Sequence, residues 1–272
     1  MRNSIATLMI GVLFALGVWF VPAVNAQQPP AYRAPRTSDG KPNLNGIWQA
    51  LNEANWNIEP HNSDFGTVPA LGAMNAVPPG MGLVEGGELP YKPEALARKR
   101  ENFANRGKGD PEAKCYRLGV PRSMYAPYPI QIIQSTGHIM MVFQFANALR
   151  TVYMTDHKAA PAESWMGWSN GHWEGETLVI ETTGFNDQTW FDRAGNYHSN
   201  ALKVVERISA RSADTLNYEA TIEDPNVFTR PWKISMPLYR RVEKDARLIE
   251  FKCIEYSEEL LYGHLRKQPS NQ

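Results

Sequence analysis

Cysteine, a surplus of either charge and long hydrophobic runs are all scarce in this chain of 272 residues. Two cysteines are too few for a disulfide-rich scaffold or for a zinc site made of four thiolates. The 28 lysines and arginines equal the 28 aspartates and glutamates in number. A chain without a basic surplus is poorly suited to bind nucleic acid or an anionic membrane surface, so we expect no nucleic-acid partner.

The sequence also lacks the motifs that identify common catalytic and metal sites. It has no Gly-x-Ser-x-Gly nucleophile elbow, and its six histidines are scattered singly. His172 and Glu174 are spaced as two ligands on one strand face, but no third ligand follows at a useful spacing. We therefore expect no metal and no cofactor.

The one long hydrophobic run lies at the N-terminus. Arg2 precedes an apolar stretch over residues 5–24, and residues 24–26 offer small or apolar side chains where a signal peptidase reads. Residues 1–26 are thus predicted to be a signal peptide cleaved before Gln27, with a retained N-terminal anchor as the alternative. No later segment is long and apolar enough to span a bilayer, so we expect a periplasmic or secreted protein without stable membrane insertion after cleavage.

The predicted export affects whether the two cysteines can form a disulfide. In an oxidising compartment Cys115 and Cys253 can pair, and closing so long a loop would stabilise the fold by about 4–5 kcal/mol on the chain-entropy model. Two free buried thiols are the alternative.

Proline and glycine, 20 of each, are concentrated before residue 130. Residues 27–130 are therefore predicted to form a long irregular arm, with the turn-rich segment 68–90 as its least regular part. One helix is expected near residues 93–105, because Pro93 suits a first helical turn and good helix formers follow it. The first barrel strand is expected near residues 46–50.

Residues 131–256 alternate polar and apolar side chains, as half-buried antiparallel strands do. The expected strands are Ile132–Ser135, Ile139–Ala146, Leu149–Asp156, Trp165–Glu174, Thr177–Phe185, Leu202–Arg211, Thr215–Asp224, Lys233–Val242 and Leu248–Glu255. So many hairpin-linked strands must close on themselves to hide their edges. We predict a mainly β protein: an antiparallel up-and-down lipocalin-like barrel with the irregular arm, one helix and a C-terminal tail at residues 257–272.

Two stretches resemble known proteins. Gly46-Ile47-Trp48 places a Gly-x-Trp where the barrel would begin, as in lipocalin-like barrels, where the tryptophan plugs the closed end. The run over residues 171–187 (Gly-His-Trp-Glu-Gly to Thr-Thr-Gly-Phe-Asn-Asp) resembles a family of exported bacterial proteins without established function. Further matching residues are Cys115, Gly119, Pro121, Arg122, Trp190, Asp192, Gly195, His198, Ser199, Glu206, Arg207 and Cys253. The resemblance covers most of residues 43–255; it implies export and a shared Cys115–Cys253 disulfide, and no catalytic role.

Glu206 is the most informative single position. The other residues on its face of the predicted strand are Leu202, Val204, Ile208 and Ala210. A buried, unpaired carboxylate is costly, so Glu206 must be paired, hydrogen-bonded or protonated. It is a candidate acid or base with a raised pKa. The alternatives are a glutamate satisfied by an internal arginine or tyrosine, and a register shift of one residue that reverses the faces.

The loop over residues 186–200 is the second candidate site. Its polar and aromatic side chains are Asp187, Trp190, Phe191, Asp192, Arg193, Tyr197, His198 and Ser199. Long loops in a tight barrel often carry function. His198 with Asp192 or Asp187 would form an acid–base pair that works near neutral pH. A loop held by Asx turns and aromatic packing is the alternative.

These features favour binding of a small, largely apolar or aromatic molecule inside a barrel rich in aromatic residues. The predicted contact residues are Trp190, Tyr197, Arg207, Asp187 and Arg150. One alternative is a cofactor-independent isomerase, hydratase, lyase or hydrolase with His198, Asp192 and Glu206 as acid–base groups. Another is an envelope interaction protein that docks through the arm, which a filled barrel would favour. The oligomeric state is not predicted.

Overall fold

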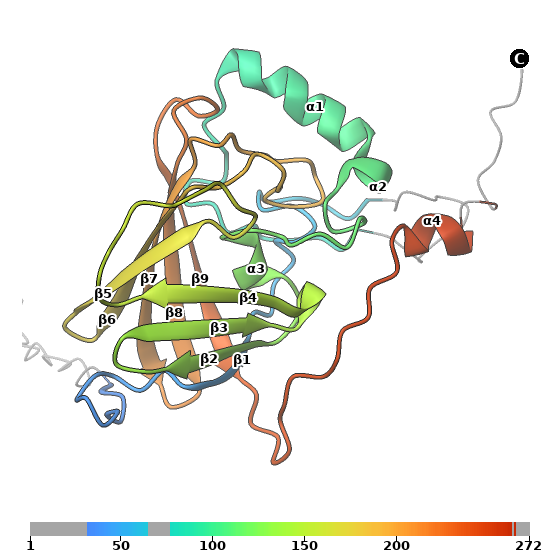
Figure 1. Ribbon diagram of the computed structural model, residues 1–272. Helices are drawn as coiled ribbons and strands as arrows, with labels where there is room; N and C mark the ends of the chain where they lie inside the picture. Colours follow the sequence, from blue (N-terminus) through green and yellow to red (C-terminus); the bar gives the residue numbers. More distant parts are fainter. Residues whose placement is uncertain (1–31, 65–76, 263, 265–272) are drawn as a thin grey trace, which may run out of the picture. The chain divides into compact units, whose positions relative to one another are not determined.

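The computed structural model describes residues 32–64, 77–262 and 264 of the chain. The predicted signal peptide and part of the turn-rich segment 68–90 lie outside the described residues. Within the described residues, nine strands form a closed barrel in chain order, so that the last strand pairs with the first (Figure 1). No helix among those residues is long and apolar enough to cross a membrane.

The strands are β1 (Gly46–Gln49), β2 (Ile130–Gln134), β3 (His138–Phe143), β4 (Ala148–Tyr153), β5 (Trp168–Glu174), β6 (Thr177–Thr183), β7 (Lys203–Ser212), β8 (Thr215–Glu223) and β9 (Trp232–Arg240). The helices are η2 (Pro93–Ala95), α1 (Leu96–Ala104), α2 (Arg106–Gly109), α3 (Arg122–Tyr125), η3 (Phe145–Asn147) and α4 (Ser257–Tyr262). The predicted mainly β barrel with a long N-terminal arm and one main helix is confirmed. The 93–105 helix is present as η2 followed by α1.

One strand pair departs from the predicted antiparallel order. β4 and β5 are parallel, with Val152 opposite Ser169 and Tyr153 opposite Asn170. The connection over residues 154–167 is long enough to cross back along the barrel, as parallel neighbours require, whereas tight hairpins join only antiparallel ones. Alternation of side chains is the same in both directions, so the sequence pattern did not reveal this exception.

The predicted strand Leu248–Glu255 is wrong. β9 pairs instead with β1, where Trp48 lies opposite Arg240 and Gln49 opposite Tyr239, and this pairing completes the ring. Residues 241–256, which we call the strap, run outside the barrel from β9 to α4 (Figure 1).

The strand registers order the inward side chains into layers along the barrel. One end, which we call the hairpin end, has Ala210, Leu216 and Leu238 in adjacent positions near the β7–β8 turn. The opposite end, which we call the arm end, has Val204, Ile222 and Trp232 in the corresponding positions.

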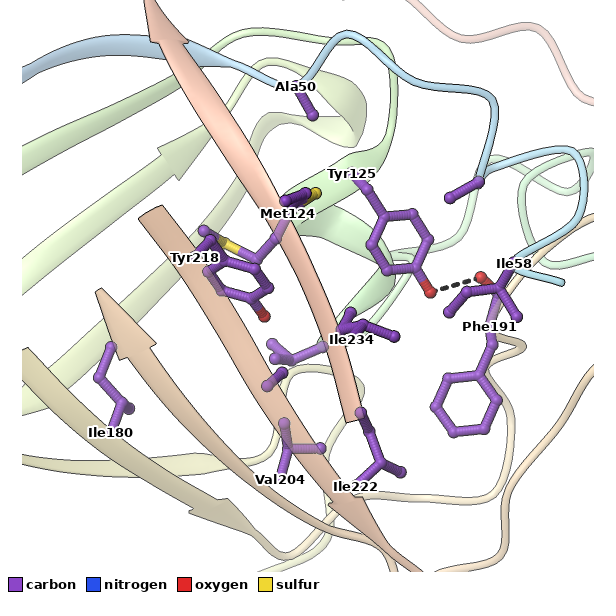
Figure 2. Close-up of a cluster of buried hydrophobic side chains, with 14 of the residues drawn as sticks. Ala50, Ile58, Met124, Tyr125, Ile180, Phe191, Val204, Tyr218, Ile222 and Ile234 are labelled. Carbon is purple, nitrogen blue, oxygen red and sulfur yellow. Dashed lines mark hydrogen bonds between the residues drawn. The ribbon is translucent and has the colours of Figure 1, made fainter. Parts of the chain in front are cut away.

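Side chains from the arm and from the loop over residues 186–200 fill the arm end. Met124 and Tyr125 of α3 are fully buried, as are Ile58 and Phe191 (Figure 2). The Tyr125 hydroxyl donates a hydrogen bond to the backbone oxygen of Phe191 at 2.7 Å, which ties α3 to the loop over residues 186–200. The Pro/Gly-rich arm thus serves as a plug for one end of the barrel.

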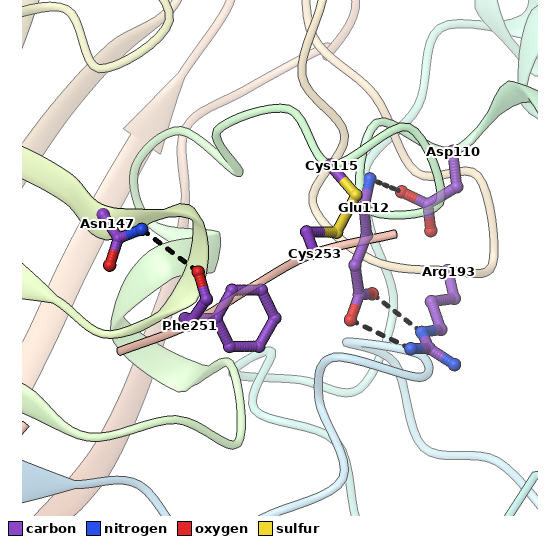
Figure 3. The surroundings of a disulfide bond; sticks show 7 residues. All are labelled: Asp110, Glu112, Cys115, Asn147, Arg193, Phe251 and Cys253. Carbon is purple, nitrogen blue, oxygen red and sulfur yellow. Dashed lines mark hydrogen bonds and ion pairs between the residues drawn. A yellow bond between two sulfur atoms is a disulfide. The ribbon is translucent and has the colours of Figure 1, made fainter. Parts of the chain in front are cut away.

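The predicted disulfide is present. Cys115 of the arm is bonded to Cys253 of the strap, with their Cα atoms 5.7 Å apart (Figure 3). The bond therefore joins the arm to a segment outside the sheet, and not to a last barrel strand.

Candidate functional site

An ion pair crosses the barrel interior between β4 and β7. Arg150 Nη1 donates to Glu206 Oε1 at 3.0 Å, and Arg150 Nη2 donates to the other carboxylate oxygen. The Tyr218 hydroxyl donates to Glu206 Oε1 at 2.9 Å. Burial, followed by the charge of Glu206, raises the pKa of Tyr218 well above its usual value.

Glu206 lies on the apolar face of β7, as predicted, and is fully buried. The alternative to a reactive acid or base was a glutamate satisfied by an internal arginine or tyrosine, and residues of both types contact Glu206. The remaining Arg150 donors reach Ser169 Oγ at 2.9 Å and Thr182 Oγ1 at 2.8 Å. Every strong donor and acceptor of this group is therefore engaged within the protein, which is the arrangement that a buried ion pair needs.

Asp192 and His198 have separate partners. Asp192 Oδ2 accepts hydrogen bonds from the backbone N–H of Ile58 at 2.9 Å and from Asn196 Nδ2 at 2.6 Å. His198 Nε2 lies 2.5 Å from Thr189 Oγ1, and its Nδ1 lies 2.8 Å from its neighbour's backbone oxygen. Burial raises the pKa of Asp192 to about 6 and lowers the pKa of His198.

The structure therefore does not form the expected acid–base pair. No hydrogen bond or ion pair joins His198 to Asp192 or to Asp187 among the described residues. Asp187 lies exposed and accepts a hydrogen bond from Gln188 Nε2. The loop over residues 186–200 is held by its own turns and by aromatic packing, since the His198 ring lies against Phe191 at 5.5 Å between centroids.

The predicted contact residues are spread over different surroundings. Trp190 and Tyr197 lie side by side through an antiparallel bridge, and the Tyr197 hydroxyl donates to the Ala95 backbone oxygen at 3.1 Å. Arg207 lies on the outer face of β7, paired with Glu174 of β5 at 2.9 Å. Of the predicted residues, the structure brings together Arg150 with Glu206, and Trp190 with Tyr197.

A charge cluster at the arm end was not predicted from the sequence. The Arg122 guanidinium is fully buried, and it bonds to Asp110 at 2.8 Å and to Glu112 at 2.8 Å. Arg193 Nε donates to the Glu112 Oε2 that Arg122 also contacts, at 2.7 Å, and Arg193 Nη2 donates to Oε1 at 2.9 Å (Figure 3). Burial alone would raise the pKa of Glu112, but Arg193 and Arg122 outweigh it and lower that pKa to about 2.

A hollow of about 300 Å³ lies at the hairpin end. Its lining residues come from the N-terminal segment, β1 and the ends of β7, β8 and β9: Tyr32, Ala34, Pro35, Asn43, Asn45, Trp48, Ala210, Ser212, Ala213, Asp214, Leu216 and Arg240. The β7–β8 ladder has a register irregularity between Ala210 and Ser212, on the rim of this hollow. Irregularities of this kind often border binding sites because they redirect side chains.

Arg240 forms the charged wall of the hollow. Its guanidinium lies 4.1 Å from the centre of the Trp48 ring, and its Nη1 donates to the Asn45 backbone oxygen at 3.0 Å. Gly46 admits this arrangement, since a Cβ there would lie 2.2 Å from Arg240 Nη1.

The donors of Arg240 are only partly engaged. Nε donates to the Ala213 backbone oxygen at 2.9 Å and lies 3.4 Å from Asp214 Oδ1. Nη2 has no hydrogen-bond partner among the described residues. The hollow therefore combines aromatic and aliphatic walls with an arginine whose Nη2 can still donate hydrogen bonds to a ligand.

No group of three histidine, cysteine or carboxylate side chains is arranged to hold a metal ion in the described part of the chain. No protein-family model matches the chain, and no curated protein matches its sequence.

Proposed function

We propose that this β-barrel protein binds a small, largely apolar or aromatic molecule, and that the hollow at the hairpin end is the binding site. The observation that carries this proposal is the volume of the hollow together with the Arg240 donors that have no hydrogen-bond partner among the described residues. A volume of about 300 Å³ lies at the lower end of the range for small-molecule sites, and such sites pair apolar walls with a few polar groups. Arg240 Nη2 supplies such a polar group.

The lining defines the chemistry of the molecule. Tyr32, Pro35 and Leu216 offer apolar area, while Arg240 favours a hydrogen-bond acceptor such as a carboxylate or a phenolate. The proposed ligand is thus a small aromatic or aliphatic acid whose ring or chain lies against the apolar wall.

The hairpin-end hollow fits this role better than the barrel interior. The midsection of the interior is occupied by the Arg150–Glu206 pair with its hydrogen-bonding partners, and the arm end is filled by α3 and the loop over residues 186–200. The same packing leaves the acid–base enzyme hypothesis without an accessible reacting group, because Glu206, Asp192 and His198 are each at most 1% exposed.

Export is part of the proposal. Disulfides persist in oxidising compartments, and the Cys115–Cys253 bond fits a periplasmic or secreted protein of the exported family that the sequence resembles. Fractionation of the source cells, followed by mass measurement of the N-terminus, tests both export and cleavage before Gln27.

Binding is tested by purifying the protein from its source, identifying co-purifying molecules by mass spectrometry, and titrating aromatic acids calorimetrically. Ala210→Phe is the blocking variant, because Ala210 lines the hollow on β7. Ser209→Phe is the matched control, because the neighbouring side chain points to the opposite face of the same strand.

We expect carboxylate ligands to bind the wild type and the Ser209→Phe variant, and Ala210→Phe to lose binding. Equal binding by Ala210→Phe and the control, or no acid bound by the wild type at millimolar concentration, would contradict the proposal.

A further inference from the structure

The strap contains a strand-forming sequence that has no strand to pair with. Residues 248–255 read Leu-Ile-Glu-Phe-Lys-Cys-Ile-Glu, rich in β-branched and aromatic side chains that favour strands. The barrel ring is closed, so it offers no edge to an additional strand. The chain runs from residue 247 to 254 without a turn and forms no bridge with any described residue.

One side of this segment is fixed to the barrel. The Phe251 ring packs against Phe145 and Tyr128, at 4.9 and 5.2 Å between centroids. The Ile249 N–H donates to Gln144 Oε1 at 3.3 Å, and the Phe251 backbone oxygen accepts from Asn147 Nδ2 at 3.1 Å (Figure 3). Together with the disulfide at Cys253, these contacts hold the segment in place.

The opposite side is free to pair. In an extended chain, the N–H and C=O of one residue point to one side, and those of the next residue point to the other. Because Ile249 and Phe251 bond toward the β3–β4 connection, Glu250 and Lys252 direct their backbone groups away from it. These groups have no hydrogen-bond partner among the described residues, and both side chains are exposed.

We propose that this free side pairs with the same segment of a second copy of the chain, as an antiparallel two-stranded ribbon across a two-fold axis. With Phe251 on the axis, Glu250 lies opposite the partner's Lys252. This ion pair occurs twice by symmetry, and opposite charges in directly facing positions stabilise a strand pair.

Backbone geometry and charge select this register. The free groups belong to even-numbered residues, so even-numbered residues must face each other to exchange hydrogen bonds. Moving the axis to Lys252 would place two lysines opposite each other, and moving it to Glu250 would do the same with two glutamates. Of these three registers, only the one centred on Phe251 places Glu250 opposite the partner's lysine.

The resulting dimer is expected to be weak. Two strands of eight residues bury much less than the roughly 1,200 Å² of a specific, stable interface. Sedimentation equilibrium on the oxidised chain, from micromolar to millimolar concentration, is therefore the appropriate measurement.

Charge reversal provides the decisive test. Glu250→Lys and Lys252→Glu each place like charges opposite each other twice, so each should raise the dimer dissociation constant by about tenfold. An equimolar mixture of the two variants faces lysines with glutamates again, and it should associate as the wild type does. Glu219→Lys, an equal charge change at an exposed position of β8, is the matched control and should leave the constant unchanged.

A chain that stays monomeric at all concentrations would overturn the proposal, and it would leave a strand of another protein as the partner to seek. The proposal is equally overturned if the single variants behave as Glu219→Lys does, or if the mixture associates no better than its components. Restored association in the mixture supports it, because loss of folding in either variant would not be repaired by mixing.

Discussion

The two ends of the barrel are closed in different ways. At the arm end, buried charged and polar groups bond to one another, as Arg122 does with Asp110 and Glu112. At the hairpin end, Arg240 lies over the ring of the buried Trp48, with its Nη2 unpaired among the described residues. The former arrangement uses its charges to hold the arm in place, whereas the latter keeps donors available beside a hollow.

Similar residue types have different roles at the two ends. Changes at the arm end should reduce stability and leave ligand affinity alone in the molecules that stay folded. Changes at the hairpin end should alter affinity with smaller effects on stability.

Arg122→Met should cause the largest loss. It leaves the Asp110 carboxylate buried without its cation, and removing one member of a buried ion pair costs about 3–5 kcal/mol. Urea unfolding measures the loss. Arg207→Met is the control, because that arginine lies on the outer face with its side chain 42% exposed, and its loss should change stability by less than about 0.5 kcal/mol. A loss below about 1 kcal/mol for Arg122→Met would mean that the cluster does not hold the arm.

Asp192→Asn should change the pH dependence of stability. Burial raises the folded pKa of Asp192 to about 6, above its unfolded value of 3.8, so between these values the folded chain keeps a proton that the unfolded chain has released. The contribution of Asp192 therefore falls as pH rises from about 4 to 6, by on the order of 2–3 kcal/mol. The variant should lack this decline.

The measurement is the difference in urea midpoint between wild type and Asp192→Asn at several pH values. Taking the difference removes the effects of His198 and Glu112, whose folded pKa values are lowered and whose contributions therefore rise with pH. A difference that stays constant from pH 4 to 7 would show that the buried carboxylate does not bind its proton more tightly in the folded chain.

Gly46→Ala tests the hairpin end. Gly46 has φ of +145°, which alanine adopts only with strain, and its new Cβ would displace Arg240 Nη1. We expect a stability loss of about 1–2 kcal/mol together with weaker binding of acids, because Arg240 would leave the wall of the hollow. Gly40→Ala is the control for backbone strain, since φ there is +76° and no atom lies within 4 Å of the added Cβ. Equal affinity in both variants would separate Arg240 from the binding site.

Much of the barrel could be predicted because its strands are half-buried, so that burial itself imposes the alternation of side chains. This also located Glu206 on the inner face and limited its partners to types that neutralise a buried carboxylate. The parallel pairing of β5 with β4 could not be predicted, because side chains alternate in the same way in parallel and antiparallel strands. That residues 248–255 lie outside the barrel could not be predicted either, because alternation does not indicate which segment closes the ring. The segment has strand propensity, but β1 occupies that place.

The candidate site was harder to predict than the fold. Arg240 and Trp48 are almost 200 residues apart in the chain, and only the pairing of β9 with β1 brings them together. His198 and Asp192 are close in sequence, yet the turns of their loop give each its own partners. Closeness in the sequence of a loop therefore predicted side-chain contact for His198 and Asp192 less reliably than the position of Glu206 on its strand face predicted its partners.

The smallest structural change should give the clearest functional contrast between the two ends. Asp214 is largely exposed, and its side chain contacts Arg240 only at 3.4 Å, so Asp214→Asn should change stability by less than about 0.5 kcal/mol. The carboxylate nevertheless lies on the rim of the hollow, where it repels an anion. Removing its charge should tighten binding of a carboxylate ligand about threefold at low salt, and the gain should shrink as salt is added. An uncharged analogue of the same ligand should bind both proteins equally, and calorimetric titration distinguishes the two cases. If affinity for the acid falls or stays the same while stability is unchanged, the anion does not bind beside Arg240, and the functional contrast between the two ends fails even though their packing differs.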